Sequence, residues 1–142
     1  MRWQQLGCFL AVGAVCLASV TACGASSSSS APSDGSDQLL GSAVQSMYIN
    51  ILEGRYAQAW KIRSDRCRAG SDVNAYSAEM RSLMNGYQTS DPVVEYTVTM
   101  RSPGKAMVRV SFPQDLGVPE FVSSGNRLWV FEANEWRFGN CD

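Results

Sequence analysis

The 142-residue chain contains no histidine. Serine–histidine–aspartate and cysteine–histidine catalysis in their usual forms need an imidazole base, so both are excluded, and so are histidine-based metal sites. The sequence also lacks a glycine-rich loop of the kind that cradles phosphates, and it has no internal repeat. Its 12 basic and 13 acidic side chains nearly cancel, which gives no indication of nucleic-acid binding.

Acidic side chains are present, but none of them lies inside an apolar run. Glu95, Glu120 and Glu132 are expected in loops or on outer faces, where water solvates them. A carboxylate that serves as a catalytic base needs desolvation or a charged neighbour to shift its pKa. We therefore expect no catalytic residue, no cofactor and no metal site, and we do not expect an enzyme.

The first 23 residues have the features of a bacterial lipoprotein signal. An uncharged run from 6 to 20 follows one positive charge, and at about 15 residues it is shorter than the roughly 20 that a membrane span needs. Val20-Thr21-Ala22 then precedes Cys23, as in a lipobox. We expect residues 1–22 to be a signal peptide and Cys23 to be lipidated, at the extracytoplasmic face of the cell membrane. The alternative is ordinary signal cleavage near Ala22.

Residues 23–37 contain a serine-rich stretch without any large apolar side chain. Such a segment cannot bury enough surface to offset its ordering entropy, so it is expected to be a flexible tether. Whether its serines are glycosylated stays open. The remaining residues, 38–142, have a suitable length for one domain.

Two cysteines are left for this domain. Cys8 and Cys16 fall in the segment that is removed, and Cys23 is the lipidation residue. In an exported domain the remaining pair, Cys67 and Cys141, most simply forms a disulfide. Two free buried thiols are the alternative.

The first half of the domain has a helical pattern. Apolar residues recur every three or four positions between 40 and 52, and Gly54 is a natural stop. A short helix is expected next, and then a loop over 64–70 that holds the cysteine. Ser71 is the expected cap of a third helix. The expected inward residues of these helices are Leu40, Val44, Met47, Tyr48, Ile51, Leu52, Tyr56, Ala59, Trp60, Val73, Tyr76, Met80, Leu83 and Met84.

After Pro92 the apolar residues recur at every second position. Val94, Tyr96, Val98 and Met100 alternate with polar residues, as in a half-buried antiparallel strand. Pro103 and Gly104 fit a type II turn into a second strand over 106–112. A short strand is expected at 121–122, and two further strands at 128–132 and 135–138. Helices followed by strands predict an α+β fold with helices packed in a curved antiparallel sheet of about four strands.

Two sequence segments are similar to segments of a known family of domains. One is Glu53-Gly54-Arg55-Tyr56-Ala57-Gln58-Ala59-Trp60, and the other is Leu128-Trp129-Val130-Phe131, a turn, Glu135-Trp136-Arg137 and Asn140-Cys141. Residues 38–142 resemble the nuclear-transport-factor-2-like (cystatin-like) domain of small lipoproteins from mycobacteria and related actinobacteria. The resemblance implies a cone-shaped fold that often leaves a pocket. It implies no activity, because this fold hosts isomerases, dehydratases, carriers and interaction modules. The rival is a cystatin-like domain with another strand order.

Two groups of residues are candidates for binding. Aromatic and methionine side chains on the expected inward faces either line a pocket or fill the core, and these are Tyr48, Trp60, Tyr76, Met80, Tyr96 and Trp129. Basic residues crowd between 55 and 68, where they either lie solvated or contact anionic lipid headgroups or an acidic partner. These basic residues are Arg55, Lys61, Arg63, Arg66 and Arg68.

The sequence therefore predicts a lipid-anchored envelope protein with a non-catalytic binding or accessory domain. The expected partner is another protein of the envelope. The alternative is a carrier or sensor of an apolar small molecule in the cone. The third hypothesis, an isomerase- or dehydratase-like enzyme, requires a carboxylate within hydrogen-bond reach of a tyrosine inside a pocket.

Overall fold

The computed structural model describes residues 37–113 and 116–141. The expected signal peptide, the lipidation residue Cys23 and the tether up to residue 36 lie outside the described residues. Within the described ranges, no helix is both long and apolar enough to cross a membrane.

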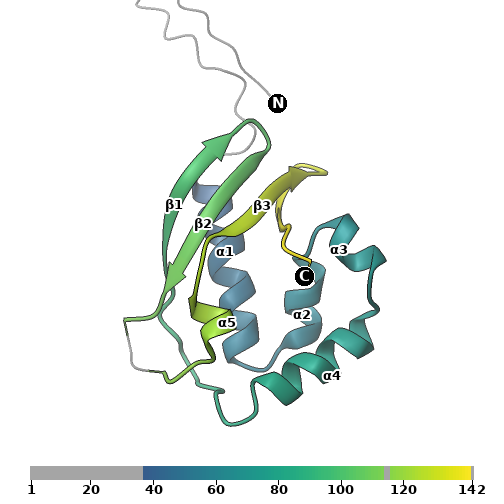
Figure 1. The fold of residues 1–142 in the computed structure, drawn as a ribbon, viewed down its shortest axis with the longest axis vertical. Coiled ribbons are helices and arrows are strands. Elements are labelled where there is room, and N and C mark those ends of the chain that lie inside the picture. The colour runs from purple at the N-terminus through teal and green to yellow at the C-terminus, as the bar shows by residue number, and fades with distance from the viewer. Residues whose placement is uncertain (1–36, 114–115, 142) are drawn as a thin grey trace, which may run out of the picture.

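The described chain is an α+β fold, as the sequence predicts (Figure 1). Its helices are α1 (Asp37–Leu52), α2 (Tyr56–Lys61), α3 (Asp65–Ala69), α4 (Val73–Leu83) and α5 (Glu120–Ser123). Its strands are β1 (Glu95–Ser102), β2 (Lys105–Ser111), β3 (Arg127–Glu132) and β4 (Glu135–Phe138). The four strands pair antiparallel in the order β1-β2-β3-β4. Helix α1 contacts both outer strands and therefore crosses one face of the sheet.

Helix α1 forms where the apolar stripe predicts it, and the whole stripe is buried. Gly54 ends it with a φ of 74°, a conformation that favours glycine. The Gly54 amide donates to the Ile51 carbonyl at 3.1 Å and the Arg55 amide donates to the Asn50 carbonyl at 2.7 Å. These two bonds make a Schellman motif, which satisfies carbonyls that the helix end leaves free.

Helix α4 starts one residue later than the sequence predicts. Asp72 is its N-cap, not Ser71, and the Asp72 carboxylate accepts from the amides of Asn74 and Ala75 at 2.7 and 2.9 Å. A carboxylate in this place also interacts favourably with the positive end of the helix dipole. Tyr76, Met80 and Met84 are buried as expected, whereas Leu83 is 45% exposed.

The segment expected as a loop contains a helix, α3. Ser64 caps it, because its Oγ accepts from the Cys67 amide at 3.3 Å. The Asp65 amide donates to a carboxylate oxygen of Glu132 at 2.6 Å, so a residue of β3 caps the same helix end. Polar composition alone suggested a loop; the second cap comes from a strand 67 residues away.

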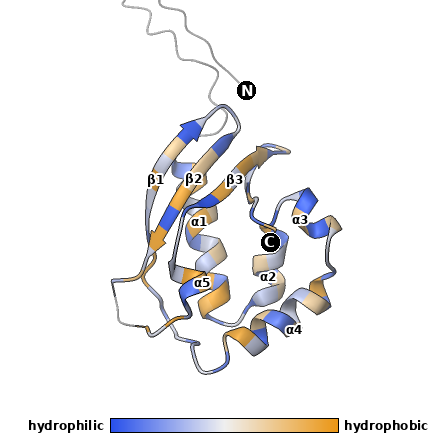
Figure 2. Ribbon diagram, viewed as in Figure 1, coloured by the Kyte–Doolittle hydropathy of each residue, from blue (hydrophilic) through white to orange (hydrophobic). Residues whose placement is uncertain are grey.

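The hairpin of β1 and β2 contains a β-bulge that changes one inward residue. The register moves between Val98, which faces Val108, and Met100, which faces Met107. The extra residue shifts the alternation, so Met100 is 64% exposed and the prediction that it points inward is wrong. Arg101 takes the position opposite buried Ala106, with its guanidinium carbon 5.2 Å from the Trp136 ring centroid. Figure 2 shows β2 as largely hydrophobic, with hydrophilic residues at its start and near its end.

The expected short strand at 121–122 is instead the helical turn α5. Pro119 precedes it, and Val122 is the residue of this turn that is buried. The next strand, β3, lies between β2 and β4 and its Trp129 is fully buried. Ala133 and Asn134 link β3 to β4 with φ values of 50° and 64°, as tight hairpin turns require.

Candidate ligand-binding pocket

A cavity of about 330 Å³ opens between α1, α4, α5 and the C-terminal segment. This volume is at the lower end of the range for small-molecule sites. Its apolar lining comes mainly from the helices: Met47, Ile51, Met80, Leu83, Phe121 and Val122. Leu83 and Phe121 are also 45% and 41% exposed, so apolar side chains lie where the pocket meets solvent.

Two tyrosines line the pocket from different helices. Tyr48 belongs to α1 and Tyr76 to α4, and each is 4% exposed. Burial raises the pKa of Tyr48 to about 12, against the opposing effect of the Arg127 charge. Burial likewise raises the pKa of Tyr76, against the opposing effect of Arg63. Both phenols are therefore protonated at neutral pH, and each lies near an arginine.

Arg63 reaches the pocket from the segment that follows α2. Its guanidinium carbon lies 4.9 Å from the centroid of the Tyr76 ring, a cation–π distance. Its backbone forms a parallel bridge to Phe138 at the end of β4, which fixes where the side chain starts. The Nε atom of Arg63 is buried and has no hydrogen-bond partner among the residues that the structure describes.

Arg127, the first residue of β3, also lines the pocket. It faces Val108 in the register and lies two residues before Trp129, so it shares the inward face of the sheet. One guanidinium nitrogen donates to the carbonyl oxygen of Phe121 in α5. Arg127 is not among the site residues that the sequence predicts. The sequence contains an indication of this position, because side chains alternate along a strand and Arg127 therefore shares a face with Trp129 and Phe131.

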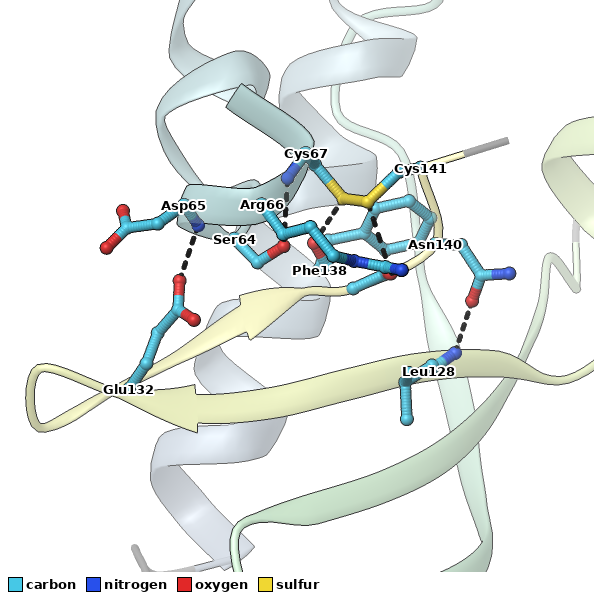
Figure 3. Close-up of a disulfide and its surroundings, with 10 residues drawn as sticks. Ser64, Asp65, Arg66, Cys67, Leu128, Glu132, Phe138, Asn140 and Cys141 are labelled. Carbon is cyan, nitrogen blue, oxygen red and sulfur yellow. Dashed lines mark hydrogen bonds between the residues drawn. A yellow bond between two sulfur atoms is a disulfide. The ribbon is translucent and has the colours of Figure 1, made fainter. Parts of the chain in front are cut away.

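The third arginine and the disulfide close the C-terminal wall (Figure 3). Cys67 of α3 is bonded to Cys141, and both residues line the pocket. Arg66 donates to the Gly139 carbonyl at 2.9 Å, and the Asn140 side chain accepts from the Leu128 amide. The tail is therefore held to both α3 and β3.

The polar lining is rich in donors and positive charge. It contains three arginines, two phenols and the Asn140 amide, and its carboxylate is that of Glu79, an exposed residue of α4. No group of three or more metal-ligating side chains occurs in residues 37–113 and 116–141. The lining therefore combines hydrogen-bond donors for an anion with apolar contacts for a chain.

The six aromatic and methionine residues that are candidates for the pocket lining lie in three different environments. Tyr48, Tyr76 and Met80 line the pocket. Trp60 borders a second, more open depression beside Arg68. Tyr96 packs on Gly41 of α1, and Trp129 is fully buried in the core.

The five basic candidates are also separated. Arg63 and Arg66 line the pocket. Arg55 forms an ion pair with Glu53, and Arg68 forms one with Asp65 while lying 5.7 Å from the Trp60 ring centroid. Lys61 is exposed at the end of α2.

No protein-family model matches this chain, and no curated protein matches it either.

Proposed function

We propose that residues 37–141 form a non-catalytic binding domain that carries or senses a small molecule with an apolar chain. The observation that supports this function is the pocket itself, a cavity of about 330 Å³ with an apolar wall. Apolar burial in such a cavity supplies the main binding free energy, and adaptable methionines at positions 47 and 80 tolerate ligands of varied shape.

A neutral apolar fluorophore tests this function. N-phenyl-1-naphthylamine fluoresces strongly in apolar surroundings, so we expect saturable fluorescence enhancement with the protein. Met80→Trp fills the cavity and should abolish the enhancement, because Met80 lines the pocket. Met100→Trp is the matched control, since Met100 is exposed on β1. If the fluorophore does not bind to the folded wild-type protein, the proposed function is wrong.

We also propose that this domain is held at the extracytoplasmic face of the membrane by a lipid on Cys23. The support is the apolar run and the Val20-Thr21-Ala22-Cys23 sequence. A cystatin-like cone is the proposed finer class of the fold. Its support is that α1 crosses an antiparallel sheet whose strands are neighbours in chain order.

Binding of an envelope protein is the second candidate function. The observation in its favour is Met100, which is 64% exposed on the outer strand β1. An exposed strand edge with an apolar side chain is a common site for protein association. Retention of a partner from solubilised envelopes by wild type, and its loss in Met100→Asp, would support this candidate.

A further inference from the structure

We infer that the molecule held in this pocket is a medium-chain acid, whose single anionic group binds between Arg63 and Arg127. This inference rests on the proposed function and specifies its ligand class. The acid is a carboxylate or a phosphate monoester, since both present oxygen atoms to guanidinium groups in the same way.

The pocket lining carries a net positive charge. Three arginines and one carboxylate line the pocket, and that carboxylate belongs to an exposed residue, Glu79. Arg66 is exposed and already donates to the Gly139 carbonyl. The more enclosed positive charges are those of Arg63 and Arg127, both partly buried. Positive charge in a partly desolvated cavity favours an anion over a neutral or cationic ligand.

Arg63 has an unpaired hydrogen-bond donor, since its Nε is buried without a hydrogen-bond partner in the described part of the chain. Leaving a buried donor unpaired is unfavourable, and more so when the group is charged. Because Nε is enclosed, a ligand in the cavity meets other atoms of Arg63. An acidic oxygen there would compensate the incompletely paired guanidinium charge, and a hydrocarbon or an ammonium group would not.

Two phenols add hydrogen-bond donors to the lining. Burial raises the pKa values of Tyr48 and Tyr76, so both hydroxyls carry their protons at neutral pH. A protonated phenol can donate to an anion. Tyr48 interacts electrostatically with Arg127, and Tyr76 interacts with Arg63. Each arginine therefore has one phenol nearby as a further hydrogen-bond donor.

The volume of the cavity limits the size of the ligand. Beyond the polar groups, the lining consists of apolar side chains of α1, α4 and α5 that end at exposed Leu83 and Phe121. The cavity measures about 330 Å³. If each non-hydrogen atom takes about 30 Å³, as a water does, roughly ten such atoms fit. Octanoate, with eight carbon and two oxygen atoms, has this size.

The test compares four eight-carbon probes on the full chain by calorimetry: octanoate, octyl phosphate, octanol and octylammonium. We expect at least one acid to bind about tenfold more tightly than octanol, and octylammonium to bind more weakly than octanol. The acid that binds more tightly identifies the headgroup. Equal affinities for octanol and both acids would overturn the inference while leaving the proposed function intact. Failure of the neutral fluorophore would instead remove the proposed function.

Variants assign the effect to residues. Arg63→Gln and Arg127→Gln should each remove the tenfold preference for the acid over octanol. Arg109→Gln is the matched control, because Arg109 is exposed on β2 and lies outside the pocket. A preference that survives both pocket substitutions would contradict the inference. The wild-type comparison decides the question if either variant does not fold.

Discussion

The guanidinium group of Arg63 lies over the ring of Tyr76, with 4.9 Å between the guanidinium carbon and the ring centroid. The two residues belong to different parts of the fold, since Arg63 is bridged to the end of β4 and Tyr76 lies in α4. Their contact therefore joins the sheet to the helical layer and brings a cation and a phenol to the same cavity.

The buried phenol of Tyr48 should make stability depend on alkaline pH. Burial raises its folded-state pKa from 10.0 to about 12, so the folded chain binds its proton more tightly than the unfolded chain. Below pH 10 both states are protonated and Tyr48 contributes no pH dependence. Between pH 10 and 12 the unfolded chain loses the proton first, and stability falls by about 2–3 kcal/mol. Urea unfolding at pH 9 and pH 11 covers the first half of this window, so a loss of about 1 kcal/mol is expected between these two pH values.

Tyr48→Phe is the comparison variant for this prediction. It should show a smaller loss of stability between pH 9 and pH 11 than wild type, because it has no proton to lose at this position. Tyr87→Phe changes an exposed tyrosine and should behave as wild type. Equal alkaline losses in wild type and Tyr48→Phe would contradict the prediction.

The contact between Gly41 and Tyr96 should make a helix-favouring substitution harmful. A Cβ atom at position 41 would lie 2.8 Å from Cζ of Tyr96 and closer still to its hydroxyl oxygen. Without a clash, Gly→Ala within a helix stabilises by about 1 kcal/mol. We expect Gly41→Ala to destabilise by about 1–3 kcal/mol in thermal or urea unfolding, because overpacking exceeds the propensity gain.

Two further variants separate the causes. Tyr96→Phe removes the nearest atom, so the double variant should recover part of the loss. Ser46→Ala changes an exposed position of the same helix and should be close to neutral. Increased stability of Gly41→Ala would show that helix α1 does not pack on Tyr96 in this way.

The Cys67–Cys141 bond should contribute a large part of the stability. The cysteines are 74 residues apart, and a loop of that length corresponds to about 4 kcal/mol on the chain-entropy scale. The double variant Cys67→Ala/Cys141→Ala should lose a comparable free energy of unfolding. Peptide mass spectrometry should find both residues alkylated after reduction only. Alkylation of either one in unreduced protein would contradict a stable disulfide.

Replacing Cys23 should release the protein from the membrane. The sequence predicts that this cysteine carries the lipid, and without an acyl chain the anchoring free energy is lost. We expect Cys23→Ala in the soluble fraction or as uncleaved precursor, and wild type in the membrane fraction. Cys8→Ala is the control and should fractionate as wild type. Membrane retention of Cys23→Ala with normal processing would refute the lipobox.

Regular patterning made most of the fold predictable. The stripe of α1, the alternation in β1 and β2, and turn residues such as Gly104 are local signals that agree with the tertiary structure. Two of the errors lie where a contact with another element decides. Helix α3 uses Glu132 of β3 as a cap, and the bulge in β1 turns Met100 outward and Arg101 inward. The residues of α3 do not indicate that Glu132 will cap the helix, and the residues of β1 do not indicate where the bulge lies.

The sequence by itself determined the α+β class, the missing imidazole chemistry, the cysteine pair and the signal-like N-terminus, because composition and periodicity act locally. Only the tertiary structure decided which residues share the pocket. It placed Arg63, expected on a basic surface, beside Tyr76, and it placed Arg127 beside Tyr48. Residues from α1, α4, β3 and the C-terminal segment meet there because the sheet and helices pack around one cavity. Such a meeting depends on the relative positions of whole elements, which no local pattern encodes.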